Sequence, residues 1–459
     1  MGLTSIERTL QTPTVLHVPY TFFPDACGGT EVYVRGLAQR LASRGYLSEV
    51  AAPGIEPSEY VNDGLPVYRF ATDRRRRLEL AYGFPDEIAA EGFRVILRKT
   101  RPRIVHLHAR TSAISERLVD AAHDAGAAVV FTYHTPTVSC ARGTMMLFGQ
   151  QPCDGIIEPK RCTACALAAL GIPKSLARLA AVAPNALAAG TRTLANDRER
   201  LSFLRIPGLI AGGRRRFYDF IRKVDHVVAV CDWVREVLER NGLAPERITL
   251  SRQGLSQALL HPPRRAARGQ CEPLRIAYFG RIDRAKGPDL LARALKLIPT
   301  VPVKIDIFAV RQAAGPDQVY DWLAAQAQLD SRLTLRMAVA PNEVIGVMAD
   351  YDLIAVPSRW LETGPLVVLE AFAAGVPVLG ADLGGIAELV HNGMDGILVP
   401  ADDTVAWAAA IVTFIDNPHL VRDMRAKIKT PRSMDAVVDD MAMVYSAVVA
   451  GNAASIGAA

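Results

Sequence analysis

The stretch from Pro357 to Ala371 carries the two residues best suited to chemistry, the glutamates Glu362 and Glu370. Glu362 follows an apolar, strand-like run in an expected loop, whereas Glu370 falls within the helical segment that comes next. The sequence neighbours of Glu370 are apolar, and a carboxylate in such surroundings is unfavourable without a hydrogen-bonding partner. The two hydroxyl groups of a ribose would be a suitable partner. We therefore expect this segment to bind a nucleotide.

Loops between a strand and a helix supply groups that could hold phosphates. Gly28 and Gly29 stand at such a junction, where glycine lets the backbone approach a ligand and the helix N-terminus offers free N–H groups. An ordinary turn is the alternative for this pair. Thr363, Gly364 and Leu366 place further backbone donors at the start of a helix.

Two cations, Arg281 and Lys286, lie in a third loop of this kind, which Pro288 follows at a helix start. A departing diphosphate gains negative charge in the transition state, so cations fixed beside it accelerate its departure. A solvated basic loop is the alternative. Because these cations would take the place of a divalent ion, we expect catalysis without a metal cofactor.

Another glycine pair, Gly384-Gly385, is followed by Glu388 and repeats the arrangement of a glycine loop with a carboxylate behind it. Together these segments resemble the retaining glycosyltransferases of the GT-B fold, in family four. The matching segments are GGTEVYVRGLAQRLASRG, VHLHAR, YFGRIDRAKGPDLL and PSRWLETGPLVVLEAFAAGVPVLGADLGGIAELVHNGMDGILVP. They extend from about residue 14 to about residue 400 in the order of the family, and the last segment is highly specific.

The resemblance implies roles for the phosphate-binding positions. Gly28 and Gly29 would lie beside the donor phosphates. Arg281 and Lys286 would neutralise the diphosphate.

The resemblance also implies roles around the sugar and the nucleoside. Glu362 would contact the donor sugar near the reacting carbon, and Glu370 would hold the ribose hydroxyls. Glu388 would lie near the nucleotide loop. His134, in the segment FTYHT, matches the histidine that faces the transferred sugar; a loop histidine with satisfied hydrogen bonds is the alternative.

Two segments depart from the family pattern. Where many members have Glu-Pro-Phe-Gly, this chain has Glu362–Pro365, and because Pro365 lacks an N–H the backbone donors must come from its neighbours. Where members usually have Asn-Gly-Val-Asp, this chain has Gln253–Ser256. The donor sugar, its base and the acceptor therefore stay open.

The composition fits a packed protein of two or three domains. The chain has 459 residues, of which 50% are hydrophobic and 22% charged, and this excludes wholesale disorder. The net charge of +6 is too weak to indicate nucleic acid and suits an anionic small molecule or a membrane surface.

The N-terminus lacks the layout of a signal peptide, and no segment reads as a convincing membrane span. We therefore expect a cytoplasmic protein. Two arginine runs, 74–77 and 214–216, are either solvated surface or a contact with anionic lipid on the inner face of the membrane.

Short apolar runs alternate with helical patterns, which is typical of βα units and parallel sheets. Helices are expected at 30–44, capped by Thr30 and ended at Gly45, and at 288–298 and 366–374. Strands are expected at 14–18, 104–108, 128–133, 224–230, 274–279, 303–309, 352–357, 376–380 and 396–399. The fold predicted is α/β, with two doubly wound, Rossmann-like domains facing across a cleft in the GT-B architecture.

The expected domains follow from this pattern. The N-terminal, acceptor-side domain spans 1–262 and has a cysteine-bearing helical insertion at about 140–222. A linker rich in proline and arginine at 263–273 leads to the donor-binding domain at 274–430. We expect the C-terminal helix and tail, 431–459, to pack back on the N-terminal domain.

Four cysteines share one segment: Cys140, Cys153, Cys162 and Cys165. Their thiolates suffice for a structural zinc site or an iron–sulfur cluster, which would fasten the segment over the acceptor side of the cleft. Unbound thiols and disulfides are the alternatives. The scattered cysteines, expected to be structural, are Cys27, Cys231 and Cys271.

Two further patterns receive structural interpretations. Asp350-Tyr351-Asp352 spells the Asp-x-Asp of metal-dependent transferases, but it leads directly into a buried strand. His106 and His108 could bind a metal, although a strand end bordering the cleft is the interpretation we favour.

The sequence thus predicts a retaining glycosyltransferase that moves a sugar from a nucleotide-diphosphate sugar to a hydroxyl group of a glycan or lipid-linked glycan. The expected setting is cell-surface polysaccharide or glycolipid biosynthesis, without nucleic acid as a partner. Two alternatives stay open: a catalytically silent nucleotide-sugar-binding protein, and an epimerase or phosphorylase of the same fold.

Overall fold

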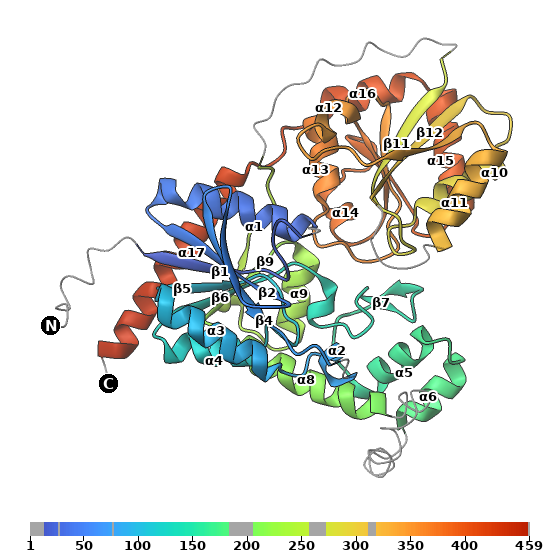
Figure 1. Cartoon of the computed structure of the whole chain (residues 1–459). Coiled ribbons are helices and arrows are strands. Elements are labelled where there is room, and N and C mark those ends of the chain that lie inside the picture. Colours follow the sequence, from blue (N-terminus) through green and yellow to red (C-terminus); the bar gives the residue numbers. More distant parts are fainter. Residues whose placement is uncertain are drawn as a thin grey trace. The chain divides into compact units, whose positions relative to one another are not determined.

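The computed structural model describes residues 13–25, 28–75, 78–182, 205–256, 272–310 and 318–457. Several predicted features lie outside these residues: Cys27, Arg76, Arg77, residues 183–204 of the insertion, residues 263–271 of the linker, and Cys271. The chain forms two compact units (Figure 1). Unit 1 runs to Arg252 and resumes at Met434, whereas unit 2 runs from Gln253 to Ser433.

Unit 1 is built on an eight-stranded sheet in the order β10-β9-β6-β5-β1-β2-β4-β3. Neighbouring strands are parallel, except that β3 runs antiparallel to β4. The strands are β1 (Thr14–Val18), β2 (Leu47–Gly54), β3 (Ser58–Asn62), β4 (Leu65–Ala71), β5 (Ile104–Leu107), β6 (Ala128–Tyr133), β9 (His226–Ala229) and β10 (Ile248–Leu250). The main helices are α1 (Gly29–Arg40), α3 (Glu87–Thr100), α4 (Glu116–Asp124), α8 (Ile206–Lys223), α9 (Asp232–Arg240) and α17 (Met434–Gly457).

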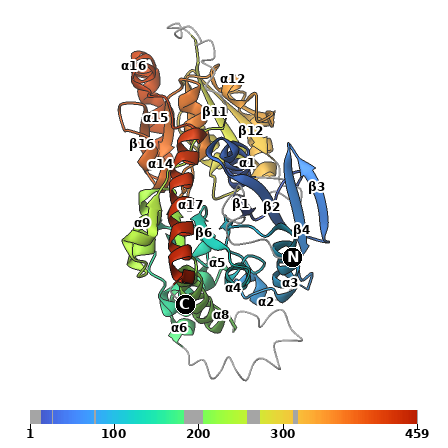
Figure 2. The ribbon, with the colours of Figure 1, turned by 90° about the vertical axis from the view of Figure 1, so that its left-hand side faces the viewer.

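Two separate apolar cores lie on the two faces of this sheet, because successive residues of a strand point to opposite faces. Val15 and Ile104 pack on one face with residues of α1 and α17. Leu16 and Val105 pack on the other face with residues of α3, α4 and α8. Helix α17, the last of the chain, lies along unit 1 and packs against α1 and β6 (Figure 2).

The first helix differs slightly from its prediction. Thr30 is not the N-cap, because α1 already begins at Gly29 and Gly28 is the capping residue. The helix continues after Arg40 as a tight 3-10 turn, Leu41–Arg44. Gly45 then ends it with a φ of 79°, a left-handed conformation that glycine adopts without strain.

The segment between β6 and β9 only partly matches the expected insertion. It carries two short strands, β7 (Met146–Leu147) and β8 (Gln151–Pro152), and the helices α5 (Pro159–Ala169) and α6 (Lys174–Val182). Helix α8 closes this segment, but its residues Phe217, Phe220 and Ile221 are buried in the main core of unit 1. The apolar face of α8 therefore makes it a core helix of the domain rather than part of an insertion.

Unit 2 is a six-stranded parallel sheet in the order β13-β12-β11-β14-β15-β16. Its strands are β11 (Leu274–Arg281), β12 (Val303–Val310), β13 (Leu333–Met337), β14 (Leu353–Val356), β15 (Val378–Ala381) and β16 (Gly396–Val399). Its helices are α10 (Pro288–Leu297), α11 (Gln318–Leu329), α12 (Val344–Met348), α13 (Leu366–Ala373), α14 (Gly384–Leu389), α15 (Thr404–Asp416) and α16 (His419–Lys427). Counted along the chain, the strand order is 3-2-1-4-5-6, which is that of doubly wound nucleotide-binding sheets.

Candidate active site

The strand order of unit 2 reverses between β11 and β14, and ligands of doubly wound sheets bind beyond the carboxyl ends of the strands at such a point. The loop after β11 and the loop after β14 meet there. Gly287, with a φ of 70°, lies so close to the second loop that an added Cβ would be 2.2 Å from the carbonyl oxygen of Pro357. Only glycine therefore allows the two loops to approach this closely.

Glu362 joins these two loops through one carboxylate oxygen. Its Oε1 atom accepts hydrogen bonds from Lys286 Nζ, Ser358 Oγ and Trp360 Nε1, each at 2.7 Å. The residue is only 5% exposed. A carboxylate with one charged and two neutral donors is held in a single orientation, and Lys286 is fixed with it.

Arg359 fastens the same two loops from the side. Its guanidinium makes a paired contact with the carboxylate of Asp289 on α10, at 2.5 and 3.1 Å, and its Nε donates to Asp402 at 2.6 Å. Its backbone N–H donates to the carbonyl of Ala285 at 2.7 Å. Burial alone would raise the pKa of Asp289, but the hydrogen bond from Arg359 holds it below the usual range. The sequence prediction missed this residue, although it stands inside the PSRWLE motif.

The second predicted cation is placed differently. Arg281 ends β11 with its side chain 46% exposed, and its guanidinium lies 3.6 Å from the carboxylate of Asp283. The structure therefore brings Lys286 together with Glu362, and places Arg281 at the outer end of the same loop.

Glu370 lies on α13, beyond the loop that carries Glu362. Burial raises the pKa of its carboxyl group to about 7. Within the described part of the chain, no side chain or backbone group forms a hydrogen bond with this carboxylate. Its carboxylate oxygens can therefore accept hydrogen bonds from the donor groups of a ligand.

The start of α14 packs closely against the backbone of Glu362 and the residues that follow it. The N–H of Gly385 donates to the carbonyl of Glu362 at 2.7 Å. An added Cβ on Gly385 would lie 2.7 Å from that oxygen and 2.7 Å from the N atom of Gly364. Thr363 is buried beside it, and Glu388 lies at intermediate exposure on α14. The second glycine pair is thus required for packing against the loop.

Pro365 is the capping residue of α13, and Leu366 is the first residue of that helix. Gly364 precedes them with a φ of 137° and approaches the side chain of Gln253. The Oε1 atom of Gln253 is buried and has no hydrogen-bond partner among the described residues. This glutamine comes from the segment that departs from the family pattern.

Gly28 and Gly29 belong to unit 1, where both are exposed at the start of α1. The N–H of Gly28 donates to Oε2 of Glu31 at 2.8 Å, so one donor of this helix end is already paired. Tyr33, one turn further along α1, makes an edge-on ring contact with His134 at 4.8 Å between centroids.

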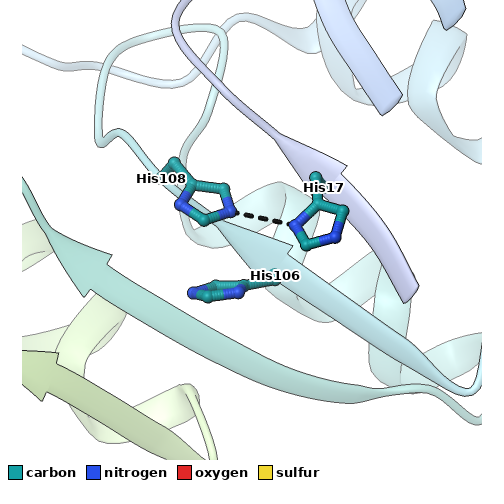
Figure 3. Close-up of side chains that lie close together, drawn as sticks. All are labelled: His17, His106 and His108. Carbon is teal, nitrogen blue, oxygen red and sulfur yellow. Dashed lines mark hydrogen bonds between the residues drawn. The ribbon is translucent and has the colours of Figure 1, made fainter. Parts of the chain in front are cut away.

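His134 follows β6 and is 4% exposed. It continues a chain of buried imidazoles: His134 Nε2 lies 3.2 Å from His108 Nδ1, and His108 Nε2 lies 3.1 Å from His17 Nδ1. The second of these contacts is drawn in Figure 3. A neutral imidazole donates through one nitrogen and accepts through the other, so the chain has a single direction of donation. Burial lowers the pKa of both His17 and His134 to about 3, which keeps them neutral.

His106 lies beside this chain, in register with His17 on the neighbouring strand. Its Nδ1 lies 2.6 Å from the hydroxyl of Tyr445 on α17, and its Nε2 lies 2.7 Å from Thr132 Oγ1. Ring nitrogens of His17, His106 and His108 all lie within 4.8 Å, the sole group of this kind in the ranges described. Since both nitrogens of His106 and of His108 have hydrogen-bond partners, the cluster is better explained as a hydrogen-bond network than as a metal site.

The sequence prediction missed His17 as a member of this network. The signal in the sequence was only its place one residue before the end of an expected strand; the structure sets it directly opposite His106. Strand pairing, which brings these two side chains together, is not visible in the sequence alone.

The four cysteines of the segment after β6 line one cavity. All four are free thiols. Cys165 is buried, and Cys140, Cys153 and Cys162 are half-buried. Burial, followed by the neighbouring Cys140 and Cys153, raises the pKa of Cys162 to about 11.

The Asp-x-Asp pattern and the two arginine runs make contacts within the fold. Asp352 Oδ2 accepts the backbone N–H of Arg275 at 2.9 Å. In the basic runs, Arg75 pairs with Asp73 at 2.8 Å, and Arg216 stacks on Phe84 at 3.6 Å. Among the described residues, no helix combines the length and apolar character needed to cross a bilayer.

Two family models match the chain. Residues 273–417 match the model described as glycosyl transferases group 1, and residues 27–185 match the model described as glycosyltransferase family 4. The first match lies in unit 2 and the second in unit 1.

Among curated relatives, the D-inositol 3-phosphate glycosyltransferase of Nocardia farcinica is 33% identical over 218 residues, which are 44% of this chain and 48% of that protein. The protein of the same name from Mycobacterium tuberculosis is 32% identical over 204 residues, 43% of this chain and 40% of that protein. The chain spans about half the length of the curated relatives it matches.

Solved structures resemble the whole chain. Sucrose-phosphate synthase of Thermosynechococcus elongatus superposes with a TM-score of 0.65 at 18% identity, covering 96% of this chain and 100% of that one. Anabaena HepE in complex with UDP superposes with a TM-score of 0.61 at 16% identity, covering 95% of this chain and 100% of that one. At such identities the likeness concerns the fold, and it confirms the predicted class of two Rossmann-like domains of the GT-B type.

Proposed function

The chain belongs to the glycosyltransferases, whose group 1 and family 4 models match its two units, and we propose that it transfers a sugar from a nucleotide-diphosphate sugar to a hydroxyl acceptor with retention. The observation that carries this proposal is the buried contact between Lys286 and Glu362 at the switch point of unit 2. A cation and a carboxylate from two neighbouring loops suit a leaving diphosphate and the sugar attached to it.

In this proposal the donor binds on unit 2. Lys286 faces the diphosphate, with Arg281 at the end of the loop as a second cation. Backbone N–H groups at Thr363, Gly364 and Leu366 would donate hydrogen bonds to phosphate oxygens at the start of α13. Glu370, whose carboxylate has no partner among the described groups, accepts hydrogen bonds from the ribose hydroxyls.

The chemical step exchanges two bonds at the anomeric carbon. The bond from that carbon to the diphosphate oxygen breaks, and a bond to the acceptor oxygen forms on the same face of the sugar. The acceptor hydroxyl loses its proton to the departing phosphate oxygen, so the products are the nucleoside diphosphate and the new glycoside. Lys286 stabilises the charge that develops on the diphosphate, a contribution that requires no divalent ion.

The acceptor side is assigned to unit 1. His134, neutral and fixed by His108, would offer a hydrogen bond to the transferred sugar, and Gly28 and Gly29 would border the phosphates. The relatives named for D-inositol 3-phosphate favour a polyol or glycan hydroxyl as acceptor, and we propose a place in cell-surface polysaccharide or glycolipid synthesis. Peripheral contact with an anionic membrane stays part of this proposal.

A thermal-shift screen against free nucleotides and nucleotide sugars tests donor binding. A ligand present at 100 times its dissociation constant should stabilise the protein by about 2.7 kcal/mol. The nucleotide that stabilises it identifies the base. Absence of a shift with every nucleoside diphosphate and nucleotide sugar would contradict the proposal.

Donor hydrolysis and transfer, measured on wild type and on Glu362→Ala, then separate the functional alternatives. The proposal predicts turnover by wild type that the variant loses. Tight nucleotide binding without turnover in either protein would instead indicate a silent binding protein. Turnover of the donor alone into an isomer, or with inorganic phosphate as acceptor, would indicate an epimerase or a phosphorylase.

A further inference from the structure

The cavity after β6 gathers four cysteines that the proposed sugar chemistry does not use. Cys140 comes from the loop after β6, Cys153 follows β8, and Cys162 and Cys165 lie one helical turn apart on α5. All four line the same cavity of unit 1. We propose that this cavity holds a four-iron, four-sulfur cluster with these four thiolates as its ligands.

The spacing of the thiols separates a cluster from a single zinc ion. Tetrahedral coordination with Zn–S bonds of 2.3 Å holds sulfur atoms about 3.8 Å apart. Within the described residues, no three cysteine Sγ atoms lie within 4.8 Å of one another, since the one group that meets this limit consists of histidines. In a four-iron, four-sulfur cluster each thiolate binds a different iron atom, so the four ligand sulfurs stand further apart than they do around one zinc ion. The four thiols therefore do not form a ready-made tetrahedral zinc site, and the larger cluster is the group that we assign to this cavity.

The backbone around the cavity turns repeatedly through left-handed conformations. Met145 and Phe148 each have a φ of 53°, which is uncommon for residues other than glycine. Such conformations persist where the surrounding structure requires them, and they gather at functional sites. One consequence is that the N–H of Phe148 points at the Sγ of Cys165, at 3.2 Å. Amide hydrogen bonds to sulfur are one means by which proteins set the potential of iron–sulfur clusters.

Cations and apolar side chains complete the lining. Arg142 and Arg161 both border the cavity, and the positive charge of Arg142 would offset part of the negative charge of a thiolate-bound cluster. Arg161 is held in place by Asp154, at 2.6 and 2.7 Å. Met145 and Ile157, both nearly fully buried, also line the cavity and limit the access of water.

The role that follows is structural. The four ligands connect α5 to the loop that begins directly after His134, and neither of these segments contributes a strand to the main sheet. Binding of the cluster replaces the protons of four thiols with bonds to iron, which ties the two segments together. The cluster is therefore expected to fix this part of unit 1 and to take no part in sugar transfer.

The composition of the full-length protein, purified without oxygen, tests the proposal directly. We expect about four iron atoms and about four acid-labile sulfides per chain, with a broad visible absorption that dithionite bleaches. Protein isolated without metal is reconstituted with ferrous iron and sulfide under a reducing thiol, and the same ratios are expected. About one zinc per chain without sulfide, or no iron bound after reconstitution, would overturn the proposal.

Variants identify the ligands. Cys162→Ser and Cys140→Ser should each lose most of the iron and sulfide. Cys231→Ser is the matched control, because Cys231 is a buried cysteine of the same unit that caps α9 and does not line the cavity; it should keep the full content. Iron and sulfide retained in both ligand variants would refute the assignment. If these variants do not fold, the ratios measured on wild type still decide between a cluster, zinc and no metal.

Discussion

The Nζ atom of Lys286 lies 2.7 Å from Oε1 of Glu362, although the two residues are 76 positions apart in the chain. Each comes from a loop at the carboxyl end of a parallel strand, β11 for the lysine and β14 for the glutamate. The pair is a charged contact between the loops after β11 and β14, and it gives the proposed donor site its most specific test.

Lys286→Gln removes the cation while keeping a hydrogen-bond donor. We expect kcat to fall by at least 100-fold, on the order of 3 kcal/mol of transition-state stabilisation, with a smaller effect on KM for the donor. Arg284→Gln is the control, because Arg284 is an exposed cation of the same loop. Steady-state kinetics with the donor identified by thermal shift provide the measurement. Equal losses in the two variants would mean that general basicity of the loop, rather than the fixed lysine, matters.

Glu370 should make nucleotide binding depend on pH. Its pKa in the empty protein is raised to about 7, and only the ionised form accepts hydrogen bonds from both ribose hydroxyls. The dissociation constant for the nucleotide should therefore rise about tenfold for each pH unit below 7. Titration calorimetry between pH 5.5 and 8 would show this change. Glu370→Gln should bind weakly at every pH; a variant with the pH profile of wild type would exclude this carboxylate as the cause.

The same carboxylate should lower the stability of the empty protein at high pH. The folded pKa lies above the ordinary value of 4.5, so the folded state holds the proton more strongly and stability falls as pH rises from about 4.5 to about 7. Glu370→Gln should consequently melt at a higher temperature than wild type at pH 8 without nucleotide. A lower melting temperature would show that the carboxylate has a stabilising partner in the empty protein.

Arg359 should act as a positioning residue. Arg359→Lys loses the paired contact with the buried Asp289, which should lower the melting temperature by several degrees and raise KM for the donor more than it lowers kcat. Arg293→Lys is the control, because Arg293 contacts the same carboxylate once, at 3.1 Å, and its side chain is 53% exposed. Kinetics unchanged in Arg359→Lys despite lower stability would indicate a purely structural role.

The buried histidines should make unit 1 sensitive to acid. The folded pKa of His17 and of His134 is lowered to about 3, so below the ordinary value of 6.5 the unfolded state binds more protons. The free energy of unfolding should thus keep its full value above pH 6.5. It should fall on acidification by about 1.4 kcal/mol per pH unit for each histidine. Urea unfolding at pH 7.5 and 5.5 should show a smaller change in His17→Gln than in wild type. His419→Gln, at an exposed position of unit 2, should behave as wild type.

Gly385 should tolerate no side chain. In Gly385→Ala the added Cβ meets the backbone of Glu362 and Gly364 at 2.7 Å, so we expect a lower melting temperature and loss of nucleotide binding. Gly346→Ala is a matched helical control with open space around its Cβ. It should be neutral or slightly stabilising, because alanine reduces the freedom of the unfolded chain. A stable, nucleotide-binding Gly385→Ala would show that the loop can shift away from α14.

The sequence by itself determined the parts of this protein that depend on local pattern. Apolar periodicity placed the strands Thr14–Val18, Ala128–Tyr133 and Gly396–Val399 at their observed bounds, and short motifs pointed to Lys286 and Glu362. These features are local, because side chains within one turn or one strand decide them. Helix α8 was misjudged for the complementary reason: its apolar residues become a core face only when a sheet lies beneath them.

Only the tertiary structure decided which distant groups share a contact. Strand register set His17 beside His106, the meeting of two loops put Arg359 on Asp289, and the turns after β6 brought four cysteines around one cavity. The physical reason is that contact between residues far apart in the chain depends on the order of the strands and on the close approach that glycine allows. No single segment of the sequence determines either of these.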